Sequence, residues 1–293
     1  MNLFVGSGVA LITPFDDKGI NFQVLDTLIE WHIEQGTDSL ILSGTTGEAT
    51  ALNLEERTAL YNHTVKRVNH RIPVIAGTGS NNTEQAIALS QLAEKCGVDG
   101  LLVVTPYYNK CTQAGLYAHY SAIANAVSIP ILLYNVPTRT AVNLLPETVA
   151  KLSNIENIIG IKEASGDITQ IVELFRMTDS AFSIYAGNDD HIFPMLALGA
   201  CGVITTVGNI IPKRVHDLIS EYNNGNVSVA KSIQFQINPL VKAVFSEVNP
   251  IPIKTAVRMM GFDVGDVRLP LTPAEKSTED QLQIEMRKLG VIL

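Results

Sequence analysis

The chain has little charge and few aromatic residues. Only 17% of its 293 residues are charged and 6% are aromatic, whereas 46% are hydrophobic. This composition excludes a disordered or fibrous protein, because such chains bury too little apolar surface to offset the entropy lost on folding. We therefore expect a folded protein with a large core. Barrels of alternating strands and helices reach this length as one domain.

Basic clusters and long apolar runs are also missing. The formal net charge is −8, and no basic run is longer than a pair such as Lys66-Arg67. This argues against nucleic acid or an anionic membrane as a partner and favours small-molecule ligands. No apolar run approaches the ~20 residues that span a bilayer. Residues 1–15 lack the order of a signal peptide, so we expect a cytoplasmic protein.

Cysteine and histidine form no metal-binding pattern in the sequence. Cys96, Cys111 and Cys201 are an odd number at wide spacings, which suits neither a disulfide framework nor a zinc site. We expect all three thiols to be reduced. The six histidines include no HExxH motif and no close cluster. Nothing in the sequence requires a metal.

Short β-rich runs recur along the chain, each followed by a segment with helical periodicity. Such alternation indicates βα units on a parallel sheet. The expected strands are residues 8–12, 39–42, 73–76, 100–104, 130–134, 158–162, 182–185 and 202–205. Helical stretches between them include residues 24–35, 54–68 and 83–96, the last ended by Gly97.

Two α/β folds show this alternation, the open doubly wound sheet and the closed barrel. The dinucleotide-binding fingerprint of the open sheet is missing, since Gly6-Ser7-Gly8 lacks a third glycine and precedes a strand. Eight regular units favour a (β/α)8 TIM barrel. Further helical patterns follow the eighth strand. We expect a catalytic barrel over residues 1–224 and a C-terminal helical extension over residues 225–293 that packs on the barrel and serves assembly.

Lys162 is the only one of the 21 lysines and arginines that lies within an expected strand. Active sites of such barrels form at the C-terminal ends of the strands. A water-poor site there lowers the pKa of an amine and frees it as a nucleophile that forms a Schiff base with a carbonyl substrate. The alternatives are a lysine that reaches solvent from the strand end, or one paired with Glu163.

Two residues near the end of the fifth expected strand complement such a lysine. Schiff-base chemistry needs groups that move protons, and the Tyr134 hydroxyl is a candidate. Its alternative role is that of a core tyrosine with a satisfied hydroxyl. Arg139, five residues later, is a fixed cation suited to bidentate recognition of a carboxylate. A surface ion pair is the alternative for Arg139.

Three further loops carry candidate residues. Gly44-Thr45-Thr46-Gly47-Glu48 offers two hydroxyls and successive N–H groups to a carboxylate, although a simple tight turn is an alternative. Tyr107-Tyr108 follows the fourth strand, where packing is the more common role of aromatic residues. Gly187-Asn188-Asp189-Asp190 follows the seventh strand, and its aspartates are typical of helix caps.

These motifs together resemble the 4-hydroxy-tetrahydrodipicolinate synthase (dihydrodipicolinate synthase) family. This family belongs to the N-acetylneuraminate lyase superfamily of class I pyruvate-dependent aldolases. The resemblance runs from about residue 8 to residue 271. The motifs that carry it are GTTGE (44–48), TPYYN (105–109), YNVPTRT (134–140), GIKEA (160–164) and NPIPIK (249–254). The motif with Arg139 is the one that discriminates within the superfamily.

The resemblance implies a catalytic mechanism. Lys162 would form a Schiff base with pyruvate, and the hydroxyls of Tyr134, Thr45 and Tyr108 would relay protons. Tyr108 would reach the site from a neighbouring subunit of a homo-oligomer, which we expect to be a tetramer built as a dimer of dimers. No organic cofactor is needed, because the lysine imine is itself the electron sink.

The resemblance also implies the substrates. Thr46, Gly187 and Ile204 would line the pyruvate pocket, and Arg139 would engage the carboxylate of L-aspartate 4-semialdehyde. The implied product is 4-hydroxy-tetrahydrodipicolinate, in the diaminopimelate route to lysine.

Two other functions are compatible with much of this pattern. One is a lyase of the same superfamily that acts on N-acetylneuraminate or a 2-keto-3-deoxy sugar acid. Arg139 argues against it, because cleavage of sugars favours neutral hydroxyl-binding groups. The other is a non-catalytic relative that binds pyruvate. Such a relative could lack one of the relay hydroxyls, but all of them are present in this sequence.

Feedback inhibition by L-lysine is expected to be weak or absent. Inhibited members of the family hold lysine with a Ser, an Ala, two His, an Asn, a Glu and a Tyr. The matching residues here are Ala49, Thr50, Leu54, Arg57, Asn81, Gln85 and Tyr107. Gln85 lacks the charge of glutamate, Leu54 lacks a ring acceptor and Arg57 adds a like charge. Glu84 is the acid nearest to the missing glutamate.

Overall fold

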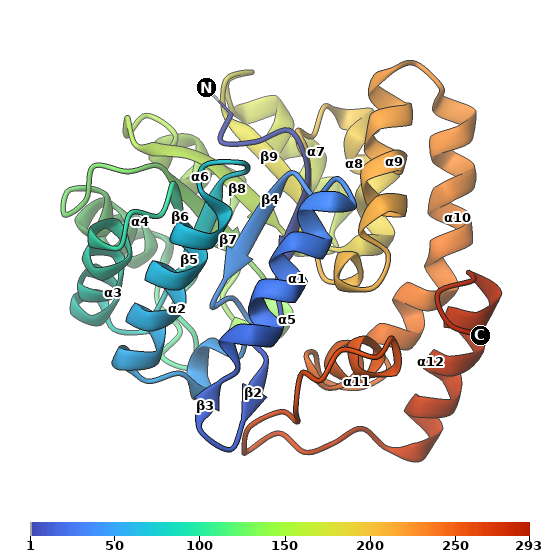
Figure 1. Ribbon diagram of the computed structural model, residues 1–293. Coiled ribbons are helices and arrows are strands. Elements are labelled where there is room, and N and C mark those ends of the chain that lie inside the picture. The colour runs from blue at the N-terminus through green and yellow to red at the C-terminus, as the bar shows by residue number, and fades with distance from the viewer. Residues whose placement is uncertain (1) are drawn as a thin grey trace.

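A closed barrel of eight parallel strands forms the centre of the protein (Figure 1). The structure is a computed structural model that describes residues 2–293. The strands are β1 (Gly6–Ala10), β4 (Ser39–Leu42), β5 (Val74–Gly77), β6 (Gly100–Val104), β7 (Ile131–Asn135), β8 (Ile158–Glu163), β9 (Ser183–Ala186) and β10 (Gly202–Thr205). Each strand pairs with its sequence neighbours in the barrel, and β10 pairs with β1. The predicted (β/α)8 barrel is confirmed.

Helices surround the barrel on the outside (Figure 1). They are α1 (Phe22–Glu34), α2 (Leu54–Val68), α3 (Thr83–Lys95), α4 (Gln113–Ala124), α6 (Pro146–Leu152), α7 (Ile168–Met177), α8 (Ile192–Leu198) and α9 (Pro212–Asn223). The short helix α5 (Pro137–Thr140) follows β7, and the 3-10 turns η1 (Ala49–Ala51), η2 (Asp189–His191) and η3 (Val207–Asn209) follow β4, β9 and β10.

Local sequence signals set the ends of several helices. Asn53 and Glu56 form a reciprocal capping box at the start of α2, which begins at the predicted residue. α3 ends where Gly97 adopts φ +81°, a left-handed conformation that favours glycine. A two-stranded hairpin of β2 (Phe15–Asp16) and β3 (Gly19–Ile20) was not predicted. Strands of two residues are too short to show a hydrophobic period.

Alternation along the strands divides the core into two layers. On β7, Leu132 and Tyr134 point into the barrel interior, whereas Ile131 and Leu133 pack against the surrounding helices. Both faces are buried, which explains why the strands are almost continuously apolar. The same alternation decides which residues reach the mouth of the barrel.

The N-terminal end of the barrel interior is filled by aromatic side chains. The ring of Phe4 stacks on that of Tyr185 with centroids 4.5 Å apart. The Tyr185 hydroxyl donates a hydrogen bond to the carbonyl oxygen of Phe4 at 2.6 Å. Both residues are buried. The interior is therefore a packed core below the mouth.

Three helices form the C-terminal extension: α10 (Val227–Val244), α11 (Ile251–Met259) and α12 (Lys276–Lys288). In Figure 1, α10 runs beside α9, and α11 lies below the barrel near β2 and β3. The division at residue 224 stays a prediction. No helix within residues 2–293 combines the length and apolar character needed to cross a membrane.

Candidate functional site

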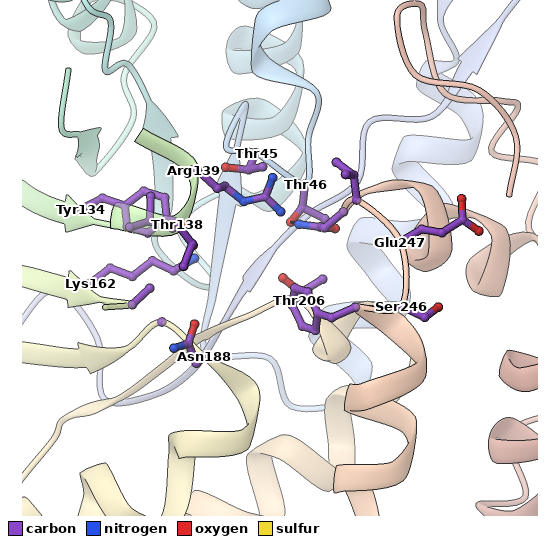
Figure 2. A pocket seen from close by; sticks show the side chains of 16 residues that line it. Thr45, Thr46, Tyr134, Thr138, Arg139, Lys162, Asn188, Thr206, Ser246 and Glu247 are labelled. Atoms are coloured by element: carbon purple, nitrogen blue, oxygen red, sulfur yellow. Dashed lines mark hydrogen bonds between the residues drawn. The ribbon is translucent and has the colours of Figure 1, made fainter. Parts of the chain in front are cut away.

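A cavity of about 520 Å³ opens at the C-terminal ends of the strands (Figure 2). It is lined by Thr45, Thr46, Tyr134, Val136, Thr138, Arg139, Lys162, Ala164, Gly187, Asn188, Thr206 and residues 245–249. Six of the eight predicted site residues therefore meet around one space. This is the end of the barrel at which enzymes of this architecture place their chemistry.

Lys162 is the buried amine of the cavity. Its side chain is 5% exposed, and Lys162 pairs in register with Tyr134 on the neighbouring strand. The lysine Nζ lies 4.5 Å from the centroid of the tyrosine ring. Figure 2 shows both side chains entering the cavity from adjacent strands. A proton donor and an amine are thus brought together in a site shielded from water.

The alternative role of Lys162, an ion pair with Glu163, is not observed among the described residues. Successive residues of a strand point to opposite faces, so Glu163 leaves the cavity. Asn135 Nδ2 donates to Glu163 Oε2 at 3.0 Å, and the backbone N–H of Ser165 donates to its Oε1. Burial raises the pKa of Glu163, while these hydrogen bonds oppose the rise.

Two threonines of the GTTGE loop form one wall of the cavity. Ser43, just before the loop, and Glu48, its last residue, both have positive φ, at +45° and +55°. Asn249 Nδ2 donates to the Thr46 hydroxyl oxygen at 3.0 Å. The loop is therefore more than a simple tight turn, because a distant segment fixes the residues that face the cavity.

Arg139 lies at the rim on α5, directly after β7, and is solvent-exposed. In Figure 2 its guanidinium is directed into the cavity. None of the ion pairs formed within residues 2–293 includes Arg139, so the alternative role in a surface ion pair is not observed. The group is free to receive a carboxylate that enters from solvent.

The loop after β9 is shaped by a close backbone approach. A Cβ at Gly187 would lie 2.6 Å from the Cβ of Ala164, so only glycine fits against the end of β8. Asp189 does not cap the helix that follows it, contrary to prediction. It is buried, and its Oδ2 accepts hydrogen bonds from the backbone N–H groups of Thr206 and Val207 at 3.1 and 2.8 Å. The aspartate secures the end of β10 instead.

Asp189 also contributes to the electrostatics of the site. Burial raises the pKa of its carboxyl, and the positive charge of Lys162 opposes this rise. The charge of Lys162 therefore favours the ionised form of this buried aspartate.

Two predicted site residues lie outside the cavity lining. Ile204 is fully buried in the barrel interior, in the same apolar cluster as Tyr134. Tyr108 is 91% exposed and has φ +72°. Its hydroxyl does not face the cavity of its own chain.

Sequence reasoning missed several lining residues. Asn188 and Thr206 follow strand ends and could have been found from that position alone. The segment of residues 245–249 connects α10 to α11 and forms the wall opposite the barrel strands. Of this segment, only Asn249 was noted, as the first residue of the NPIPIK motif.

A second cavity of about 830 Å³ adjoins the first and shares Thr45, Val136, Arg139, Val248 and Asn249 with it. Its lining includes six of the seven positions compared above with the lysine-binding residues: Ala49, Thr50, Leu54, Arg57, Gln85 and Tyr107. The guanidinium of Arg57 is buried and donates to the carbonyl oxygen of Gly77 at 3.2 Å. A fixed positive charge thus borders this space.

The described residues hold no group of three or more His, Cys, Asp or Glu that could bind a metal ion. The three cysteines are free thiols, as predicted.

Comparisons with known proteins identify the family of this chain. A model of the dihydrodipicolinate synthetase family matches residues 3–289. The 4-hydroxy-tetrahydrodipicolinate synthase of Thermoanaerobacter sp. (strain X514) is 50% identical over 293 residues, which cover 100% of this chain and 99% of the relative. An enzyme named 4-hydroxy-tetrahydrodipicolinate synthase 1, from Clostridium acetobutylicum, is 49% identical over 292 residues, with 100% of both chains covered.

Solved structures give the same result. The crystal structure of dihydrodipicolinate synthase from Thermotoga maritima has a TM-score of 0.98 at 42% identity, covering 99% of this chain and 100% of that chain. The enzyme from Aquifex aeolicus has a TM-score of 0.96, also at 42% identity, with 99% of both chains covered. Both sequence and structure therefore lead to one conclusion: the chain belongs to the dihydrodipicolinate synthetase family.

Proposed function

We propose that this protein condenses pyruvate with L-aspartate 4-semialdehyde and forms 4-hydroxy-tetrahydrodipicolinate, in the diaminopimelate route to lysine. The observation that carries the proposal is the buried amine of Lys162 beside Tyr134, in a cavity with an unpaired arginine at its rim. Relatives about 50% identical over the whole chain have the corresponding name.

The first half of the reaction builds an imine. The neutral amine of Lys162 attacks the keto carbon of pyruvate, and the carbinolamine that forms loses water. Tyr134 and Thr45 supply and remove the protons that these steps require. The Thr46 hydroxyl and the loop around it hold the pyruvate carboxylate, next to Gly187.

The second half forms the carbon–carbon bond. Loss of a methyl proton converts the imine to an enamine, whose carbon attacks the aldehyde carbon of the second substrate. The amine of that substrate then attacks the imine carbon, closes the ring and releases Lys162 as a free amine. Arg139 holds the carboxylate of the aldehyde substrate through charge-assisted hydrogen bonds. The lysine imine supplies the electron sink, so the reaction uses no organic cofactor.

The proton relay is completed between subunits. Tyr108 is almost fully exposed on this chain, so its hydroxyl is available to a second copy. We propose a homo-oligomer in which Tyr108 of one subunit reaches the cavity of the next, arranged as a dimer of dimers in the cytoplasm.

Pyruvate with borohydride should inactivate the protein irreversibly, because the reductant traps the imine as a secondary amine. Peptide mapping by mass spectrometry should place the adduct on Lys162. Lys162→Ala should fold normally and take up no label, whereas Lys151→Ala, which removes an exposed lysine on α6, should be labelled like the wild type. Labelling at any other lysine would refute the mechanism.

Arg139→Ala should impair the use of aspartate semialdehyde far more than that of pyruvate. Loss of a charge-assisted contact costs about 2–4 kcal/mol, which lowers kcat/KM for the aldehyde by about 30- to 1000-fold. Arg176→Ala removes an exposed arginine on α7 and is the control. An equal loss in kcat/KM for both substrates would show that Arg139 acts structurally.

Mixing two inactive variants, Tyr108→Phe and Lys162→Ala, should restore activity. Hybrid oligomers contain sites in which one subunit supplies the lysine and its neighbour supplies the tyrosine. Native mass spectrometry verifies that the subunits exchange. Exchange without a gain in activity would exclude a role for Tyr108 in the neighbouring site.

Initial rates should be almost unchanged by millimolar L-lysine. The second cavity presents Arg57 and Gln85 where an ammonium group would need acceptors, and each lost polar partner costs about 1–3 kcal/mol. Arginine, which has the same charge, serves as the comparison ligand. Clear partial inhibition below about 1 mM would show that lysine still binds, with Glu84 as a substitute acid.

A further inference from the structure

A buried ion pair joins the C-terminal extension to the GTTGE loop. Lys254 Nζ donates to Glu48 Oε1 at 2.8 Å, and both side chains are only 2% exposed. Lys254 lies in the first half of α11, and Glu48 is the last residue of the loop. The pair connects residues 206 positions apart in the sequence.

The remaining polar atoms of the pair are also satisfied. Lys254 Nζ donates to the carbonyl oxygen of Asp266 at 2.9 Å, and Glu48 Oε2 accepts from the backbone N–H of Arg268 at 2.8 Å. The lysine Nζ lies 4.1 Å from the centroid of the Phe15 ring. Burial lowers the pKa of Lys254, while the charge of Glu48 opposes that change. Together these contacts hold the Glu48–Lys254 ion pair in one defined position.

A second contact from the same segment holds the loop two residues earlier. Asn249 Nδ2 donates to the Thr46 hydroxyl oxygen at 3.0 Å, and both residues are buried. Thr46 and Glu48 are thus restrained from one side by residues 249 and 254. The left-handed backbone of Glu48, unusual for a residue other than glycine, is the kind of conformation that persists only where the surroundings impose it.

Attachment of the extension does not depend on this pair. Arg268 forms a bidentate ion pair with Glu56 of α2, with distances of 2.9 and 2.6 Å. Helices α10 and α12 pack on each other, and α10 packs on α9. A buried ion pair adds little net stability over an apolar pair of similar volume. What distinguishes the Glu48–Lys254 pair is therefore its position, in the same loop as Thr45 and Thr46.

We propose that Glu48 and Lys254 are positioning residues, which hold the Thr45 and Thr46 hydroxyls at the distance from Lys162 that pyruvate requires. The inference rests on the proposed function, since it assigns these residues a part in the pyruvate half-reaction. It also gives the extension a role in catalysis as well as in assembly.

Lys254→Met and the double variant Glu48→Gln/Lys254→Met test the proposal. The single variant leaves Glu48 buried without a partner and loses both stability and activity. The double variant has no buried charge at this place, so its thermal stability should return toward that of the wild type. Its kcat/KM for pyruvate should stay at least tenfold low, because the loop is no longer held. Its KM for aspartate semialdehyde should change less than about twofold, since Arg139 lies on α5 outside the loop.

The matched control is Lys213→Met, which breaks the exposed pair of Lys213 with Asp217 on α9 and should leave all rate constants unchanged. A folded double variant with the pyruvate kcat/KM of the wild type would overturn the proposal. Equal losses for both substrates would also overturn it, since they would indicate a general structural role.

Trapping by borohydride separates this inference from the function on which it rests. Wild-type protein that takes up no pyruvate at Lys162 would refute the proposed function itself. If the wild type is labelled, slower labelling of the double variant at subsaturating pyruvate supports the positioning role. Labelling of the double variant at the wild-type rate contradicts that role and leaves the proposed function intact.

Discussion

The pairing of β1 with β10 closes the barrel, and the geometry of the mouth depends on this seam. Gly6 and Gly202 are opposite each other there, and a Cβ on Gly202 would lie 1.9 Å from the carbonyl oxygen of Gly6. Glycine therefore lets the two strands approach closely enough to pair. A closed ring of parallel strands directs alternate residues inward and brings all C-terminal ends to one rim. Lys162 and Tyr134 face each other across neighbouring strands for that reason.

The charge of the cavity differs from that of the protein as a whole. The chain has a net charge of −8, yet the cavity is lined by Lys162 and Arg139 and, among the described residues, by Glu247 as its one acid. The Glu247 carboxylate accepts a hydrogen bond from the backbone N–H of Glu275 at 3.0 Å. Two carboxylate substrates thus meet a local positive field in an acidic protein. In the proposed reaction, the buried Lys162 reacts with pyruvate and the exposed Arg139 binds the second substrate.

Features with a local cause could be predicted from the sequence. Apolar runs located all eight strands to within about two residues, and the capping box fixed the start of α2. Lys162 was found because a charged residue at the end of a buried strand is unusual. The sequence did not predict the contacts of Asn249, Lys254 and Asp189, because their partners lie far away along the chain. No local sequence pattern indicates such contacts. The role proposed for Tyr108 involves a second chain, so the contacts within one chain do not define it.

The stacked side chains of Phe4 and Tyr185 fill the N-terminal end of the barrel interior, which leaves the barrel a single entrance. In the proposed reaction, pyruvate bound to Lys162 occupies the inner end of the cavity, and the aldehyde enters above it. Water released during imine formation must then leave through the same opening before the second substrate covers it. The order in which the two substrates bind in the proposed reaction thus depends on side-chain packing at the opposite end of the barrel.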